Sequence, residues 1–264
     1  MERRATAGPV LAHGGGLSSA LQMEGVEATA LWTLHCRAAF ADGPVLRDPQ
    51  AMAWRARIPP SALTRFGRPV ASFAARAAAF DEEVSWLLQR ASGACVVSLG
   101  EGLETQRYRV TGYARWTTVD LADAIRAREQ FVQPDDRHQH IADDATTLGW
   151  MRVLPDAPHV VVAQGLFMYL EPVQVERIVR AVSERAGWSL VFDIVPPWVS
   201  AVTRYGLPWA RFRIPRMPWG ARRCDLEARV RTWTQGRGSA HLRRIALPAR
   251  GAWSPKTWMV RWAR

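Results

Sequence analysis

The residues with the clearest chemical potential are two glycines at the end of a short apolar run. In the stretch "CVVSLGEGLET", Gly100 and Gly102 follow residues 95–99, whose side chains are typical of a buried strand. Glycine allows a tight turn and a close approach of the backbone to a nucleotide-like ligand. Position 105 is Thr105, so the third glycine of a dinucleotide fingerprint is missing. Two glycines also occur in ordinary strand-to-helix turns.

Acidic residues further along the chain favour the ligand-binding interpretation. Asp120 ends the next strand-like run, where a carboxylate can accept hydrogen bonds from both ribose hydroxyls. It can also cap the helix that follows. In "IADDATTLGW", Asp143 or Asp144 can accept a bond from an adenine amino group, and Asp144 is the better candidate. These positions fit the adenosine part of a methyl donor or of a dinucleotide.

The elements that must position these residues alternate along the chain. Short apolar runs are separated by helix-like stretches, of which "EPVQVERIVRAVSERA" is the clearest. This alternation predicts a parallel, doubly wound α/β sheet that binds its ligand beyond the carboxyl ends of the strands. "HLRRIALPA" and "TWMVRWA" then predict a terminal antiparallel hairpin at the sheet edge. That order is expected of a Rossmann-like methyltransferase sheet rather than of a dehydrogenase. The strand-like runs lie at residues 94–99, 114–119, 137–142, 159–164 and 188–195.

Three regions are expected along the chain. Residues 1–16 are interpreted as a flexible N-terminus, and residues 17–90 as a helical cap, because they contain helix-compatible runs and almost no strand signal. Residues 91–264 form the sheet domain, and an insertion at about 196–222 is expected to cover the substrate.

Composition narrows the class of protein. The 264 residues are 48% hydrophobic, enough for a sizeable core, but no segment approaches the roughly 18 consecutive apolar residues of a membrane-spanning helix. Cys36, Cys95 and Cys224 show no disulfide or zinc spacing, and His138 with His140 lacks a third ligand nearby. We therefore expect a cytoplasmic protein with reduced thiols, without a metal site and without a membrane partner.

The positive charge is concentrated in the last quarter of the chain. Residues 201–264 hold 15 Lys or Arg against 2 Asp or Glu, a net charge of +13, whereas the other residues hold 20 against 22. Arginine with tryptophan suits a flat anionic small molecule or a nucleic acid, but arginine also serves as solvated surface.

Four motifs occur in order: "FAARAAAFDEEV", "VVSLGEGLETQRYRV", "WTTVDLADAIRARE" and "VVAQGLFMYL". They resemble the leucine carboxyl methyltransferase and polyketide O-methyltransferase family, of the tetracenomycin type, and the resemblance covers about residues 25–197. It implies a class I methyltransferase that uses S-adenosylmethionine and releases S-adenosylhomocysteine. It further implies O-methylation of a carboxylate or hydroxyl on a small anionic or aromatic, polyketide-like acceptor. No oligomeric state is implied.

The resemblance also implies roles for individual residues. Arg76 would bind the methionine carboxylate of the donor, and Tyr169 would border the methyl-transfer cavity and contact the acceptor. No catalytic base is assigned, because a carboxylate acceptor is already ionised near neutral pH and in-line transfer depends mainly on position. The cofactor-binding residues implied are Arg76, Gly100, Gly102, Asp120, Leu121, Asp144 and Gln164.

Three positions depart from the family pattern. Gln164 stands where a glutamate usually contacts the ammonium group of the donor, and Glu104 and Gln106 in "GLETQ" replace the residues of "GLDTR". Either the donor binds more weakly or a neighbouring acid such as Glu101 compensates. These changes permit a weakly active, a specialised or a catalytically inactive protein.

The acceptor is expected to lie under the segment 196–222. Trp198 would stack on a planar acceptor, while Arg204, Arg211 or Arg213 would pair with its carboxylate. A basic surface loop would have the same composition. The alternatives to an O-methyltransferase are an RNA-binding or RNA-modifying methyltransferase, an NAD-dependent dehydrogenase and a noncatalytic protein of this fold. Further aromatic candidates in the segment are Tyr205, Trp209 and Trp219.

Overall fold

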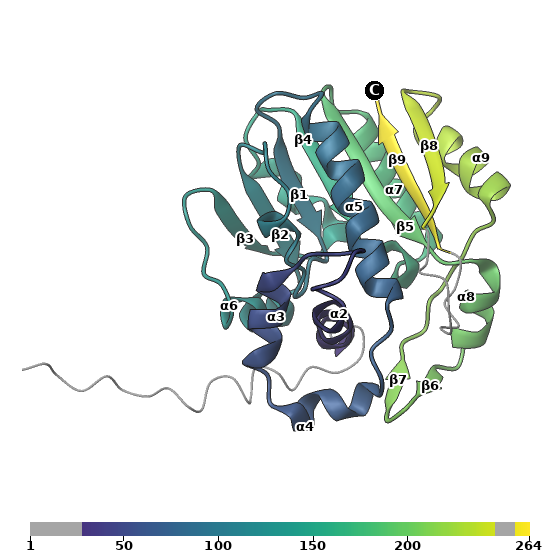
Figure 1. Cartoon of the computed structure of the whole chain (residues 1–264). Coiled ribbons are helices and arrows are strands. Elements are labelled where there is room, and N and C mark those ends of the chain that lie inside the picture. Colours follow the sequence, from purple (N-terminus) through teal and green to yellow (C-terminus); the bar gives the residue numbers. More distant parts are fainter. Residues whose placement is uncertain (1–27, 246–256) are drawn as a thin grey trace, which may run out of the picture.

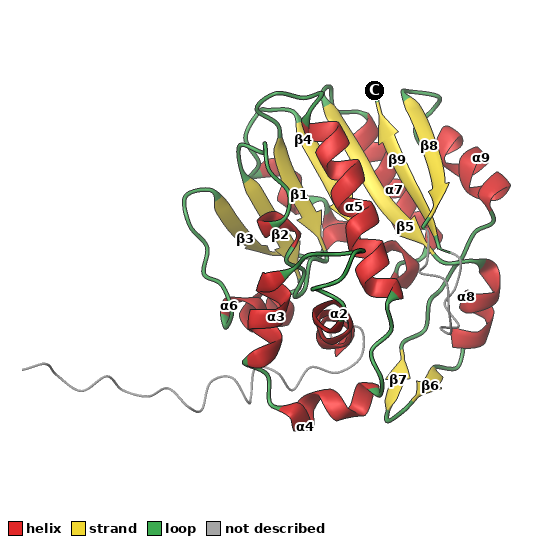
Figure 2. Ribbon diagram, viewed as in Figure 1, coloured by secondary structure: helices red, strands yellow, loops and turns green. Residues whose placement is uncertain are grey.

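A seven-stranded sheet forms the centre of the computed structural model, which describes residues 28–245 and 257–264 (Figures 1 and 2). The strand order is β3-β2-β1-β4-β5-β9-β8. The first five strands along the chain run parallel, and β9 and β8 add an antiparallel hairpin at one edge. This confirms the predicted Rossmann-like fold class. The strands are β1 (Cys95–Leu99), β2 (Trp116–Asp120), β3 (His138–Ala142), β4 (His159–Ala163), β5 (Trp188–Ile194), β8 (Ser239–Arg244) and β9 (Trp258–Ala263).

The central strands are continuous apolar runs because both faces of the sheet are covered. Every residue of β1, β4 and β5 is buried, whereas the edge strands β3 and β8 carry polar and partly exposed side chains. β1 pairs with β2 on one side and with β4 on the other. The strand order therefore reverses between β1 and β4, and this switch point creates a crevice at the carboxyl ends of these two strands.

Helices cover both faces of the sheet. On one face, α5 packs on β4 and β5 through an apolar stripe that includes Phe80, Val84 and Leu88. On the other face, α7 presents Val175 and Ile178, and a capping box at Glu171 starts this helix. The helices are α2 (Ala28–Ala39), α3 (Pro49–Ala56), α4 (Pro60–Leu63), α5 (Ser72–Leu88), α6 (Ala122–Glu129), α7 (Pro172–Ser183), α8 (Pro197–Thr203) and α9 (Arg223–Trp233).

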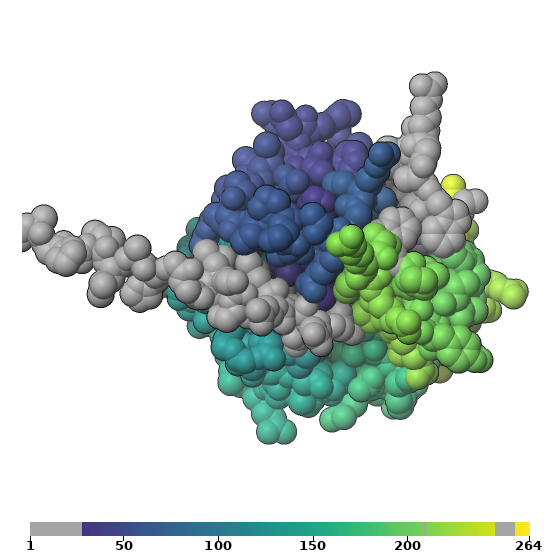
Figure 3. Space-filling model, turned by 90° about the horizontal axis from the view of Figure 1, so that it is seen from below, coloured from purple at the N-terminus to yellow at the C-terminus, as the bar shows by residue number. Residues whose placement is uncertain are grey.

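The N-terminal helices lie where the parallel strands end. In Figure 1, α2, α3 and α4 lie below the carboxyl ends of the strands, while α5 belongs to the layer on the sheet. Figure 3 shows this end of the molecule, where the helices before the sheet lie beside the green segment that contains α8, β6 (Leu207–Trp209) and β7 (Phe212–Ile214). The expected flexible N-terminus, residues 1–16, lies outside the described residues. Within the described ranges, no helix is both long and apolar enough to span a bilayer.

Candidate functional site

A cavity of about 260 Å³ lies at the carboxyl ends of β1, β2, β3 and β4. We call it the strand-end cavity. It is the place where a doubly wound sheet binds its ligand, because the strand order reverses there. Every residue predicted to bind the cofactor lines it, although these residues come from α5 and from the ends of four strands. They are Arg76, Gly100, Gly102, Asp120, Leu121, Asp144 and Gln164.

The turn after β1 requires its two glycines. Gly100 and Gly102 have φ values of 62° and 50°, in the left-handed region that favours glycine. A Cβ atom on Gly100 would lie 2.9 Å from Cδ1 of Leu166, and one on Gly102 would lie 2.9 Å from Cβ of Ala30. The absence of side chains therefore lets the turn pack closely and leaves its backbone open to the cavity.

Asp120 connects the ends of β1 and β2. Its Oδ2 accepts a hydrogen bond of 2.7 Å from Gly102 N, and its Oδ1 accepts one of 2.8 Å from Leu121 N. Burial raises the pKa of Asp120 to about 6, although both hydrogen bonds oppose that shift. The carboxyl group is therefore mostly ionised above pH 7, and each oxygen keeps acceptor capacity for a ligand hydroxyl. Asp120 does not cap α6, whose N-cap is Leu121.

Leu121 and Asp144 lie at the outer part of the strand-end cavity. Leu121 is 47% exposed and lines the cavity. Asp144 is also exposed, and its Oδ1 accepts a bond of 2.8 Å from Thr146 N at the start of a 3₁₀ turn. The neighbouring Asp143 instead accepts bonds of 3.0 Å from the Thr147 hydroxyl. An apolar side chain beside a free carboxylate oxygen suits a flat heterocycle that carries an amino group.

A buried charge cluster forms the opposite end of the cavity. Glu104 accepts hydrogen bonds from Gln164 Nε2 at 2.8 Å, from Arg109 Nη2 at 3.0 Å and from Thr105 N at 2.9 Å, and it pairs with Arg37 Nη1 at 3.1 Å. Burial alone would raise the pKa of Glu104, but the two guanidinium groups lower it to about 2. Glu104 is therefore ionised at any physiological pH.

The cluster continues away from the cavity. Arg109 also binds Asp81 at 2.6 Å and Asp48 at 2.5 Å, and Gln106 Nε2 donates to Asp81 Oδ1 at 3.0 Å. Gln106 is not among the residues lining the strand-end cavity. Its departure from the family pattern thus changes the support of the cavity rather than its surface.

Glu101 does not supply the acid that position 164 lacks. Its buried carboxylate accepts bonds from Arg128 Nη2 at 3.0 Å, from Trp116 Nε1 at 3.2 Å and from the Thr118 hydroxyl. These partners belong to β2 and α6, and they engage both oxygens of the carboxylate. The acid nearest to Gln164 is instead Glu104.

Three buried polar atoms at this end of the cavity have no hydrogen-bond partner within the described part of the chain: Gln164 Oε1, Arg37 Nε and Arg76 Nε. All three side chains line the cavity. Gln164 Oε1 offers an acceptor and Arg76 Nε a positively charged donor, which complements the ammonium and carboxylate groups of an amino acid. Arg37 Nε lies 4.0 Å from Asp48 Oδ2. Arg37 was not predicted, and the only signal in the sequence is an arginine inside the apolar helical run "LHCRAAF".

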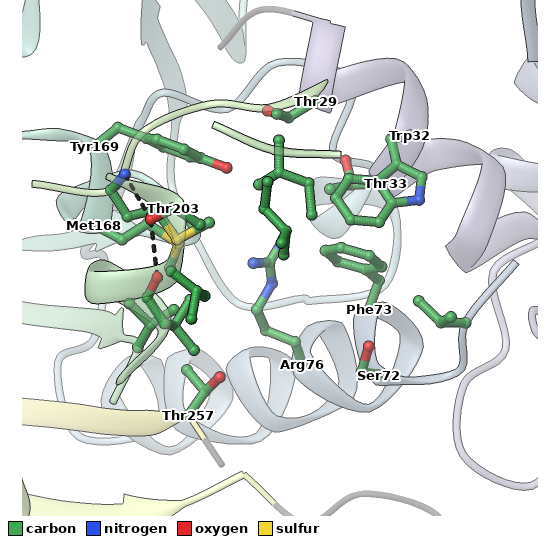
Figure 4. Close-up of a pocket in the computed structure, with 18 of the residues that line it drawn as sticks. Thr29, Trp32, Thr33, Ser72, Phe73, Arg76, Met168, Tyr169, Thr203 and Thr257 are labelled. Atoms are coloured by element: carbon green, nitrogen blue, oxygen red, sulfur yellow. Dashed lines mark hydrogen bonds between the residues drawn. The ribbon is translucent and has the colours of Figure 1, made fainter. Parts of the chain in front are cut away.

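A second cavity, of about 140 Å³, adjoins the first (Figure 4). We call it the apolar cavity, because aliphatic and aromatic side chains dominate its walls. Most of them come from α2, from α5, and from the α8 to β7 segment predicted to cover the substrate. The apolar lining residues are Trp32, Val70, Phe73, Met168, Val195, Trp198, Val199, Val202, Leu207, Ile214, Met217 and Ile245, and the others are Thr29, Thr33, Ser72, Arg76, Gly165, Tyr169, Thr203 and Thr257.

The two cavities meet at a junction of five residues that line both: Thr29, Thr33, Arg76, Gly165 and Tyr169. Figure 4 shows the Arg76 side chain reaching from α5 into this space, with Phe73 on one side and Tyr169 across from it. Gly165 has a φ of 70°, and a Cβ atom there would lie 2.9 Å from Arg76 Nη1. Position 165 must therefore lack a side chain for Arg76 to enter the junction.

Two further groups define the electrostatics of the junction. The buried Asp193 accepts a bond of 2.6 Å from Gly165 N, and its Oδ2 lies 3.8 Å from Arg76 Nη1. Burial raises the pKa of Tyr169 to about 12, although the positive charge of Arg76 and a hydrogen bond with Thr29 oppose the shift. Tyr169 is consequently a neutral phenol that can donate a hydrogen bond but cannot act as a base near pH 7.

A comparison with protein families identifies the class of protein. The family described as leucine carboxyl methyltransferase matches residues 30–183, more than half of the chain. The chain belongs to the leucine carboxyl methyltransferase family. The resemblance seen in the sequence is thus confirmed, and S-adenosylmethionine is the cofactor of this methyltransferase. A search of curated proteins found no match.

Solved structures agree with this family membership at the level of the fold. A putative methyltransferase from Thermobifida fusca is 15% identical, with a TM-score of 0.56 over 96% of this chain and 98% of that chain. The methyltransferase domain of bacterial CtHen1 is 13% identical, with a TM-score of 0.50 over 70% of this chain and 97% of that chain. At such identities the likeness concerns the fold alone, which is that of a Rossmann-like methyltransferase.

The predicted acceptor residues of the methyltransferase fall into two groups. Trp198 and Tyr169 line the apolar cavity, but Arg204, Arg211 and Arg213 are exposed and do not line it. Side chains alternate along β7, so Phe212 and Ile214 point inward while the arginines between and before them point outward. Arg213 Nη1 donates to the backbone oxygen of Tyr205 at 3.1 Å.

Two of the three other aromatic candidates, Tyr205 and Trp219, do not line the apolar cavity. Trp219 is buried, donates a bond of 2.9 Å to Phe167 O and packs edge-on against Trp233, so it belongs to the core. Tyr205 is 82% exposed and is not among the residues lining the cavity. The side chain of Trp209 lies outside the described residues.

The histidine pair belongs to the sheet edge. His138 contacts Asp135 at 2.7 Å, and His140 contacts Glu129 at 3.1 Å. Over residues 28–245 and 257–264, no group of three or more potential ligands is arranged to hold a metal ion. Cys36, Cys95 and Cys224 are all free.

Proposed function

We propose that this methyltransferase methylates an oxygen atom of a small apolar or aromatic acceptor, and that a carboxylate is its preferred nucleophile. The observation that carries the proposal is the lining of the apolar cavity. Among its described lining residues there is no Asp, Glu or His. A hydroxyl acceptor would need a base, whereas a carboxylate is ionised near neutral pH. An aromatic polyketide that carries a carboxyl group is one acceptor of this kind.

The strand-end cavity is the proposed donor site. Asp120 would accept hydrogen bonds from the ribose, and Leu121 with Asp144 would contact the adenine ring. Arg76 and Gln164 would hold the amino acid end, as their unpartnered atoms suggest, and Arg37 lines the cavity beside them. S-adenosylmethionine supplies an activated methyl group on a sulfonium centre. With both ends held in this way, the reacting centre would face the junction with the apolar cavity.

The residues of the junction orient the acceptor and exclude water. The Tyr169 hydroxyl lines the apolar cavity at its donor side and can hold the acceptor carboxylate with a neutral hydrogen bond, since the Arg76 guanidinium is assigned to the donor. Apolar walls from Phe73, Met168 and Trp198 keep water away from the reacting atoms. Position and desolvation are the main requirements for in-line transfer to an ionised nucleophile.

We also propose that the reaction takes place in the cytoplasm. The three cysteines are unpaired, and two of them are buried, as is usual in a reducing compartment.

A paired-acceptor assay tests the acceptor chemistry. The protein is incubated with methyl-labelled S-adenosylmethionine and with aromatic acids, each matched by the phenol and the primary amide of the same ring system. A methyl ester releases volatile labelled methanol in mild alkali, whereas a methyl ether and an N-methyl amide do not. We expect alkali-labile label from the acids and little label from the other two. Alkali-stable label from the phenols would refute the carboxylate preference.

A further inference from the structure

The orientation of the Gln164 amide is fixed by a charged neighbour. Gln164 follows β4 and lines the donor cavity, and its Nε2 donates a hydrogen bond of 2.8 Å to Glu104 Oε2. This bond decides which end of the amide is nitrogen, because a carboxylate can only accept. The other end, Oε1, is buried without a hydrogen-bond partner in the described ranges. The amide therefore presents an unused acceptor.

The charge behind this amide is negative and permanent. Glu104 has 6% of its surface exposed, and four donors from Arg37, Arg109, Thr105 and Gln164 converge on its two oxygens. Its ionised form is strongly stabilised by these contacts. A neutral glutamine next to a fixed carboxylate thus differs from an isolated glutamine, because hydrogen bonds in a chain polarise one another.

The charge balance around the amide favours a cation. The guanidinium groups of Arg37 and Arg109 face three carboxylates, those of Asp48, Asp81 and Glu104. When all three acids are ionised the cluster carries one excess negative charge. Gln164 alone would offer a hydrogen bond without any of this charge.

We propose that Gln164 and Glu104 act as one unit that binds the ammonium group of the methyl donor. Gln164 Oε1 accepts a hydrogen bond from the ammonium group. Glu104, which lies behind Gln164 as seen from the ligand, orients the amide and supplies the negative charge. The inference rests on the donor cavity proposed above.

The proposal predicts that an added acid at position 164 weakens donor binding. Gln164→Glu places an acid next to the ammonium group, which would strengthen binding if position 164 acted alone. In this cluster the new carboxylate would face Glu104 Oε2 across 2.8 Å, in place of the present donor. Two carboxylates at that distance repel each other or share a proton. Gln164→Glu should therefore weaken donor binding.

Isothermal titration calorimetry with two ligands tests the unit. One ligand is S-adenosylhomocysteine, and the other is its analogue with hydrogen in place of the α-amino group. Gln164→Glu and Glu104→Gln should each weaken binding of S-adenosylhomocysteine roughly tenfold to a hundredfold, the range for losing a hydrogen bond to a charged group. Binding of the desamino analogue should change by less than about threefold, since it lacks the group in question.

Exchanging the two side chains provides a variant in which binding should be restored. The double variant Glu104→Gln with Gln164→Glu restores one carboxylate and one amide, so S-adenosylhomocysteine should bind within about threefold of the wild type. The matched control is Gln89→Glu, the same substitution at an exposed glutamine that lies outside the charge cluster and does not line the cavity. It should leave the affinity for both ligands unchanged.

Several results would overturn the inference. Tighter binding of S-adenosylhomocysteine to Gln164→Glu would show that position 164 acts alone. Equal losses for both ligands would show a structural role for the pair. If Glu104→Gln fails to fold, the single variant Gln164→Glu still decides between these outcomes. Failure of the wild type to bind S-adenosylhomocysteine would overturn the donor cavity as well, whereas binding without ester formation would count only against the proposed acceptor.

Discussion

The titration of Asp120 gives a quantitative prediction about donor binding. Burial raises its pKa from 3.8 to about 6, against the hydrogen bonds from Gly102 and Leu121. With that pKa, the ionised fraction falls from about 10/11 at pH 7 to about 1/11 at pH 5. If the ionised form binds the ribose hydroxyls, the affinity for an adenosine ligand should fall about tenfold over this range.

The choice of ligand separates the effect of Asp120 ionisation on binding from the effect of Asp81 ionisation. The pKa of Asp81 is also raised to about 6 by burial, but Asp81 belongs to the cluster at the amino acid end. 5′-Methylthioadenosine has the ribose and adenine but no amino acid end, so its binding should report Asp120 alone. Calorimetry from pH 5 to pH 8 should show the tenfold loss for the wild type and a flat, weaker profile for Asp120→Asn. Parallel profiles for the two proteins would refute the assignment of the ribose to Asp120.

The same shift has a consequence for stability, with a defined sign. The folded ligand-free protein binds the Asp120 proton more tightly than the unfolded chain does, because its pKa is about 6 instead of 3.8. The stabilisation is fully present below about pH 4 and is lost as the pH rises through about 6. A difference of about two pKa units corresponds to about 3 kcal/mol. Denaturation at several pH values should show this slope in the wild type and a smaller one in Asp120→Asn.

Three further predictions concern the junction and the acceptor. Gly165→Ala should weaken S-adenosylhomocysteine binding, because the new Cβ atom would meet Arg76, and calorimetry measures this loss. It should also lower the stability by about 1 kcal/mol, because φ at this position is positive, and thermal denaturation measures this change. The double variant Arg211→Ala with Arg213→Ala should leave the KM for the acceptor unchanged, since both side chains are exposed and outside the cavity; a large rise would contradict this placement. Trp198→Ala should raise that KM without changing donor affinity.

The parts of the strand-end cavity that local sequence patterns encode were predictable. A strand is recognised by its apolar run, and parallel strands bring their carboxyl ends to the same edge of the sheet. For this reason Gly100, Asp120 and Asp144 line one cavity although they are far apart in the sequence. The motif resemblance added Arg76 and Gln164, which no local pattern would single out.

The charge cluster could not be predicted, because it depends on contacts between distant segments. Arg37 and Glu104 are separated by more than sixty residues, and nothing in either stretch marks the other as its partner. The direction of the Glu101 carboxylate depends on Arg128 and Trp116 in the same way. That Arg204, Arg211 and Arg213 lie outside the apolar cavity could not be predicted for a different reason: total charge says nothing about which face of a short hairpin a residue occupies, as Arg213 shows.

The proposal that donor and acceptor meet at the junction of the two cavities is tested most directly by a crystal structure with S-adenosylhomocysteine and an aromatic carboxylic acid. We predict that the thioether sulfur lies at the junction beside Gly165 and Tyr169, and that the carboxylate of the acid faces it from the apolar cavity. A sulfur atom buried elsewhere, or an acid bound on the exposed arginine surface of β7, would contradict this arrangement.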